Sequence, residues 1–161
     1  ARDIHPRNKQ AVGNRLGDWA LNRCHGRADL PESGPFFRGH EVDGDSILVQ
    51  FDHAGAGLTG RRGKQIDGFA IQGSDGNWHW AEVEVVGQDR LRISHPEATA
   101  PTAVRYAWQD NPVRANLVSS HGLPAAPFKT IEGYNTLSDL VRDPDMTPGP
   151  ANRNSPVREI E

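Results

Sequence analysis

The chain has 161 residues, which is the length of one domain or of a small domain with appendages. Only 35% of the residues are hydrophobic, and 17 glycines and 12 prolines favour turns and short strands over long helices. A formal net charge of -3 gives no signature of nucleic-acid binding, one cysteine excludes an internal disulfide and a cysteine-based zinc site, and no apolar run reaches the ~20 residues of a membrane span.

Residues 7–24 carry the one convincing helical pattern. A single apolar stripe at helical period is formed by Val12, Leu16, Trp19 and Ala20. Gly26 is expected to end this helix. Cys24 falls on the face that we expect to be buried, which predicts a reduced thiol in the core.

From residue 35 to residue 106 the pattern changes to short strands. Polar and apolar residues alternate, and turns rich in Gly and Asp separate the apolar runs, which lie at residues 46–51, 69–73, 77–86, 91–94 and 103–108. This spacing predicts an antiparallel sandwich or barrel of about six or seven strands.

The predicted fold class is therefore mainly β, in three parts. Residues 1–26 form the helical block, residues 33–128 a β-sandwich-like domain, and residues 129–161 an irregular tail. Prolines interrupt every candidate element of the tail, which is either a linker or a packed strap.

The first residues place a carboxylate two positions before an imidazole. Asp3 and His5 lie in residues 3–10, DIHPRNKQ, and Pro6 favours an extended His5, so that both side chains project from one face. The aspartate could accept a hydrogen bond from one imidazole nitrogen and leave the other to take a serine proton. This is the acid–base half of a hydrolase triad, although an isolated Asp-x-His is more often a surface or capping histidine.

The wider sequence resembles the C-terminal part of the sialate O-acetylesterase family, which are SGNH-type serine esterases. The likeness begins at DIHPRNKQ and continues through FDHAGAGL at 51–58, GFAIQG at 68–73, VRYAW at 104–108 and GLPAAPF at 122–128. It covers residues 3–128 in order, and the tail beyond Lys129 has no counterpart in it.

The resemblance implies roles for the first residues. His5 matches the general base of the family and Asp3 its orienting acid, although many SGNH enzymes separate the two by three positions rather than two. Residues 1–26 would be the last catalytic block and the last helix of the SGNH α/β hydrolase layer. The nucleophilic serine and the oxyanion-hole donors of the family lie in earlier blocks that this sequence does not contain.

We therefore expect the C-terminal region of an esterase that removes O-acetyl groups from sugars. Its implied partners are an O-acetylated sugar or glycan and an N-terminal hydrolase half, supplied in cis or in trans, with no nucleic acid and no membrane. The family resemblance suggests a secreted or periplasmic location. The alternative is a non-catalytic carbohydrate-binding or scaffold β-domain.

Three further features have a structural and a functional interpretation. Ser74 lies in a turn between strands and does not fit a nucleophile elbow. The segment 51–58 is either a strand end followed by a glycine turn or a loop that lets backbone approach a sugar. Trp78 and Trp80 are either packing residues of the sheets or a platform for sugar stacking.

No metal site and no cofactor are predicted. The seven histidines include no His-x-His and no His-Glu-x-x-His spacing.

Overall fold

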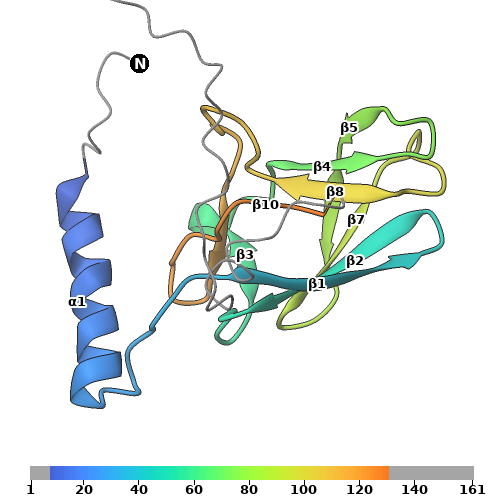
Figure 1. Ribbon diagram of the computed structural model, residues 1–161. Coiled ribbons are helices and arrows are strands. Elements are labelled where there is room, and N and C mark those ends of the chain that lie inside the picture. The colour runs from blue at the N-terminus through green and yellow to red at the C-terminus, as the bar shows by residue number, and fades with distance from the viewer. Residues whose placement is uncertain (1–7, 131–161) are drawn as a thin grey trace, which may run out of the picture.

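The computed structural model describes residues 8–130, which form one helix followed by short antiparallel strands (Figure 1). The mainly β fold with an N-terminal helix is confirmed, and in the described part of the chain the sheets do not close into a barrel. The elements in chain order are α1 (Lys9–His25), β1 (Phe36–Asp43), β2 (Ser46–Asp52), β3 (Leu58–Gly60), the 3-10 turn η1 (Arg61–Gly63), β4 (Phe69–Gln72), β5 (Trp78–Trp80), β6 (Glu82–Val85), β7 (Arg90–Ser94), β8 (Ala103–Tyr106), β9 (Leu117–Ser119) and β10 (Phe128–Lys129).

Two four-stranded sheets and one strand pair make up the β part. The first sheet has the order β1-β2-β7-β6, the second has the order β10-β8-β4-β5, and β3 pairs with β9. Every pairing between named strands is antiparallel. Figure 1 shows the two larger sheets facing each other, with the β3–β9 pair at the end nearer to α1.

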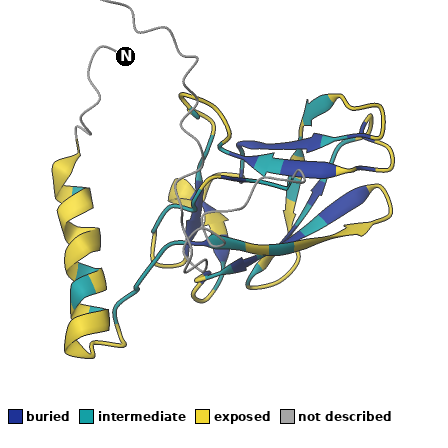
Figure 2. Cartoon of the chain, in the orientation of Figure 1, coloured by how far each residue is buried: buried dark blue, intermediate teal, exposed yellow. Residues whose placement is uncertain are grey.

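The core lies between the facing sheets because the strands alternate apolar and polar side chains. In β2 the buried positions include Ile47, Val49 and Phe51, and the opposite β7 contributes Leu91 and Ile93. The second sheet supplies a matching row that consists of Phe69, Ile71, Val104 and Tyr106. Figure 2 shows the buried residues concentrated in these strands, whereas α1 is exposed along most of its length.

Tyr106 connects the second sheet to the β3–β9 pair. Its hydroxyl oxygen accepts a hydrogen bond of 2.9 Å from the backbone N–H of Leu117, and both residues are buried. Burial raises the pKa of the Tyr106 hydroxyl, and this effect outweighs the bond from Leu117, which lowers it.

Helix α1 begins two residues later than predicted. The side-chain oxygen of Asn8 accepts a hydrogen bond of 3.1 Å from the backbone N–H of Ala11, which caps the helix start. The predicted end is confirmed, because Gly26 adopts the left-handed conformation with φ 69° and Arg27 N–H bonds to Leu21 O at 3.0 Å.

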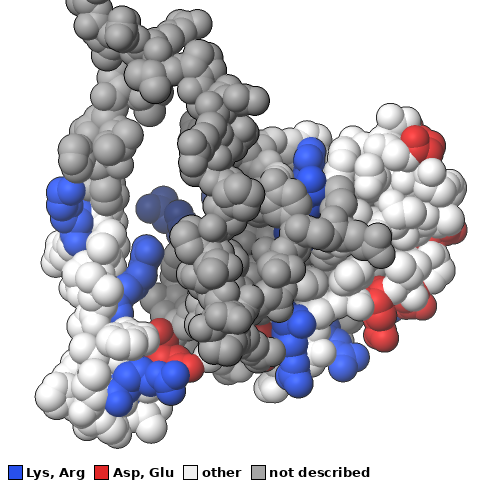
Figure 3. All heavy atoms as spheres, in the orientation of Figure 1, with Lys and Arg blue, Asp and Glu red and all other residues white. Residues whose placement is uncertain are grey.

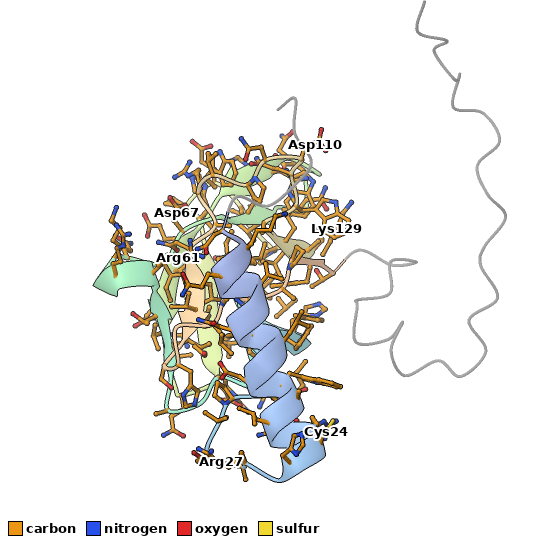
Figure 4. The ribbon with its side chains drawn as sticks, turned by 90° about the vertical axis from the view of Figure 1, so that its left-hand side faces the viewer. Cys24, Arg27, Arg61, Asp67, Asp110 and Lys129 are labelled. Carbon is orange, nitrogen blue, oxygen red and sulfur yellow. The ribbon has the colours of Figure 1, made fainter. Side chains whose placement is uncertain are left out.

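The prediction that Cys24 is a core thiol is wrong. None of the residues of α1 is buried, and Cys24 is exposed near the end of the helix, where Figure 4 labels it. The helical period identifies an apolar face, but it does not say what that face packs against. Leu16 is 64% exposed and Trp19 is 49% exposed in this chain.

The predicted strand at residues 77–86 is two strands in two different sheets. Strand β5 pairs with β4 in the second sheet, and β6 pairs with β7 in the first. The chain changes sheets at Ala81, whose backbone N–H donates to Phe69 O at 3.1 Å. The predicted number of strands was also too low, because β3, β9 and β10 have only two or three residues each, which is too short to show a clear alternation.

The predicted boundaries of the β-domain at residues 33 and 128 stay a prediction. The ends of the strands alone do not show where a domain begins or ends. The tail assigned to residues 129–161 lies outside the described residues from 131 onward. Within residues 8–130, no helix is long and apolar enough to span a membrane.

Replacement of Tyr106 by Phe should lower the free energy of unfolding by about 1–3 kcal/mol, because the buried Leu117 N–H loses its acceptor. The folded pKa of Tyr106 is raised, so above pH ~10 the unfolded state loses this proton before the native state does. Stability contributed by the protonated hydroxyl should therefore be present below pH ~10 and be lost as the pH rises further. Urea denaturation at pH 7 and pH 10.5 should show a smaller alkaline loss in the Phe variant.

Deletion of residues 1–26 should leave the β part folded, because α1 has no buried residue. The truncated chain should unfold in one cooperative transition near the midpoint of the full chain. Phe128→Ala in the same truncated chain is the matched control, and it should cost about 3–5 kcal/mol because it removes a buried ring from the core. Loss of the cooperative transition on deletion alone would show that α1 is part of the core.

Candidate functional site

The predicted catalytic residues Asp3 and His5 lie outside the described residues. The described chain begins at Asn8, which caps the start of α1. Their assignment as orienting acid and general base therefore stays a prediction. The nearest described surroundings in the sequence are α1 and the segment that links it to β1, and these surroundings define the first candidate region.

A shallow groove lies between α1 and the β part of the molecule. It has a volume of about 260 Å³ and is lined by Arg15, Leu16, Trp19, the segment 31–34, Leu123 and Pro124. The helix contributes apolar side chains, and the segment 31–34 approaches the 123–124 turn so closely that a Cβ on Gly34 would clash with Pro124 O. Only glycine fits at that position.

Glu32 connects this region to the end of β2. One of its carboxylate oxygens lies 3.3 Å from Arg23 Nε on α1, and the other lies 3.5 Å from His53 Nδ1. Figure 3 shows basic and acidic side chains next to one another at this end of α1. Both contacts are partly exposed, so they contribute little to stability.

The segment 51–58 forms a strand end followed by a glycine turn. Strand β2 ends at Asp52, and His53 has a positive φ of 59°, which is uncommon for a residue with a side chain. The His53 ring also contacts Phe36 edge-on at 6.1 Å. These contacts account for His53 as a structural residue. The alternative, that this loop lets the backbone approach a sugar, stays a prediction.

The same loop is held by the segment that follows β9. Backbone N–H of Ala56 donates to Ser120 Oγ at 2.9 Å, and Gly55 lies against Ser120 and His121 with φ 65°. A Cβ at Gly55 would meet Ser120 Oγ at 2.5 Å, so this close approach requires glycine. The candidate region thus consists of α1, Glu32, the 53–58 loop and the 120–124 segment.

Trp78 and Trp80 form a second patch on the outer face of the second sheet. They alternate with His79 in the edge strand β5, and Trp80 is 43% exposed. The guanidinium of Arg105 lies 4.2 Å from the ring of Trp78, and that of Arg114 lies 4.6 Å from the ring of Trp80. Such cation–π contacts are typical of side chains that pack at the edge of a sheet. They do not test whether the two rings bind a sugar, which stays a prediction.

Ser74 lies in the turn between β4 and β5. Its backbone N–H donates to Thr99 O at 3.0 Å, and its side chain is at the exposed tip of the hairpin. This is the predicted turn position.

The structure also brings together three residues that the sequence analysis did not select. His79 from β5 lies beside His95 and Glu97, which follow β7. One ligand atom from each lies within 4.8 Å of the others. The signal in the sequence was slight: a polar residue at an inward position of an alternating strand, and a His-x-Glu step sixteen residues later.

Comparisons with known proteins show that the chain is similar to part of an esterase. Neither the models of known protein families nor the curated proteins gave a match. A solved structure of a novel carbohydrate acetylesterase from Xanthomonas citri matches with a TM-score of 0.74 and 39% sequence identity over 81% of this chain. The matched region is 30% of the length of that esterase. This chain is therefore homologous to part of a carbohydrate acetylesterase.

Proposed function

We propose that this chain is the C-terminal region of a sialate O-acetylesterase-like serine esterase that removes O-acetyl groups from sugars. The observation that carries the proposal is the 39% identity over 81% of the chain to a carbohydrate acetylesterase, with a TM-score of 0.74. At that identity, a shared fold reflects common descent. The resemblance of residues 3–128 to the sialate O-acetylesterase family also supports it.

In the proposed mechanism His5 carries two protons, one in each half of the reaction. It takes the proton of the nucleophilic serine as that oxygen attacks the acetyl carbonyl, and it then gives the proton to the departing sugar oxygen. In the second half it deprotonates the water that hydrolyses the acetyl-serine and returns that proton to the serine. Asp3 would hold the imidazole in the required tautomer and stabilise its charged form.

In this proposal the described residues would hold the catalytic residues in position. Helix α1 starts at Lys9, four positions after His5, so a fixed helix start would limit where His5 can lie. The exposed apolar face of α1, which includes Leu16 and Trp19, would pack against the hydrolase half of the complete esterase.

One observation favours the alternative of a non-catalytic carbohydrate-binding or scaffold domain. The outer face of the second sheet exposes Trp80 beside Arg114, and aromatic rings flanked by hydrogen-bond donors can hold sugars. The reading frame around this chain distinguishes the two proposals, because the esterase requires a serine block of the SGNH type in the same or a partner chain.

The purified 161-residue chain should not hydrolyse an activated acetyl ester above the level of its His5→Ala variant. The physical reason is that this sequence contains no candidate for the nucleophile and the oxyanion hole, and loss of a nucleophile costs many orders of magnitude in rate. Release of p-nitrophenol from its acetate is the measurement. Robust turnover that survives removal of residues 1–10 would contradict both the proposal and the role of His5.

In the complete esterase, three variants should differ in a defined order. His5→Ala should lower kcat by several orders of magnitude with little change in KM, because His5 acts in the transition state. Asp3→Asn should lower kcat less, through the wrong tautomer, and His53→Ala should have the mildest effect because its contacts are with Glu32 and Phe36. A His53 defect as deep as that of His5 would place the 53–58 loop inside the catalytic pocket.

A further inference from the structure

A histidine pair and a carboxylate meet where the edge of the second sheet approaches the first. His79 lies at the centre of β5, between the outward Trp78 and Trp80, and its side chain is only 18% exposed. His95 and Glu97 lie in the turn that follows β7. The rings of His79 and His95 stack with centroids 4.7 Å apart, and Glu97 Oε2 lies 3.4 Å from His79 Nδ1.

One atom of this cluster lacks a partner. The Nε2 atom of His79 is buried and has no hydrogen-bond partner among the described residues. Buried polar atoms are nearly always paired, so this nitrogen calls for a water or another polar group beside it. The nitrogen that faces Glu97 is Nδ1, so the metal bond proposed below would use Nδ1 and not the unpaired Nε2. The inward position of β5 would otherwise suit an apolar side chain, because the neighbouring inward residue Ile71 of β4 is fully buried.

We propose that His79, His95 and Glu97 bind one divalent metal ion of the zinc type. Two imidazoles and one carboxylate are a ligand set that Zn²⁺ accepts, whereas Mg²⁺ and Ca²⁺ prefer sets made of oxygen alone. The site is separate from the proposed esterase chemistry, and nothing in that proposal depends on it.

The distances are compatible with a shared ion once the side chains of His95 and Glu97 have turned toward it. Metal bonds of 2.0–2.1 Å at a tetrahedral angle separate two ligand atoms by about 3.4 Å. The contact from His79 Nδ1 to Glu97 Oε2 already has this length, and the ligand atoms of all three residues lie within 4.8 Å of one another. The side chain of Glu97 is 76% exposed, so it can turn toward an ion with little cost in packing.

Binding would require one rearrangement. The two imidazole planes are 20° apart, so their in-plane lone pairs run side by side and do not converge. His95 would have to rotate out of the stack and give up the bond that its Nδ1 accepts from Glu97 N–H at 3.2 Å. That bond is exposed and long, so the coordination bond can replace it.

The ion would fasten a weakly held strand. Strand β5 has three residues and pairs only with β4, whereas His95 and Glu97 belong to the connection from the first sheet to the second. A metal bound by all three side chains would tie the edge of one sheet to this connection. Three protein ligands leave a fourth position for water, and the exposed side of Glu97 gives the ion a path of entry.

Titration of the full chain with ZnCl₂ and with CoCl₂ tests the proposal. Isothermal calorimetry should give one Zn²⁺ per chain, Co²⁺ should develop the visible absorption of a tetrahedral site, and MgCl₂ should give no heat of binding. His95→Ala and Glu97→Gln should each weaken Zn²⁺ binding at least about tenfold. At the same Zn²⁺ concentration, the Tm should rise less in the His95 variant than in the wild type.

A matched control addresses another place where zinc could bind. Cys24 and His25 are adjacent and exposed at the end of α1, so the double variant Cys24→Ser, His25→Ala should keep the full affinity. His95 and Glu97 are not buried, so we expect both ligand variants to fold. Circular dichroism of each variant checks this. The absence of Zn²⁺ binding by the wild type would overturn the proposal. So would binding that the control variant loses and His95→Ala retains.

Discussion

The β structure depends on the packing of Phe128 between the two sheets. This ring stacks on Phe37 at 4.5 Å and meets Phe51 at 5.8 Å, both from the first sheet. From the second sheet it meets Phe69 and Tyr106 at 6.1 and 6.3 Å. Strand β10 has only two residues, so its backbone bonds alone would not hold it, and the buried ring is what fixes the strand.

The aromatic cluster reaches the candidate region through a short series of contacts. Tyr106 packs against Phe128 and accepts the hydrogen bond of Leu117 at the start of β9. The chain leaving β9 presents Ser120, which holds the 53–58 loop at Ala56 N–H. That loop begins at His53, whose partner Glu32 also binds α1. The position of the loop is therefore set by the core, whereas the partly exposed contact between His53 and Glu32 contributes little.

The sequence predicted those parts of the fold that depend on one face of one element. Alternation revealed β2 and β7 because each buries one side, and Gly26 marked the helix end because a left-handed residue is required there. The change of sheet at Ala81 was not predictable, since the alternation runs on through β5 and β6 and only their partners differ. The cluster of His79 and His95 was also not predicted, because its members are far apart in the sequence and are brought together only by the pairing of the strands.

The exposed stripe of α1 illustrates the limit of periodicity most clearly. The 3.6-residue pattern correctly identifies an apolar face, yet Leu16 and Trp19 only line an open groove and stay 64% and 49% exposed in this chain. Contiguous apolar surface of this kind usually marks an interaction site. The homologous esterase contains this region as 30% of its length, so most of its chain lies outside the match. An amphipathic helix whose apolar face is left largely exposed beside its own β part is what the proposed esterase would require. In the complete esterase that we propose, α1 would be the last helix of the hydrolase domain and would lead into the β-domain. Its apolar face would then belong to the core of the hydrolase domain.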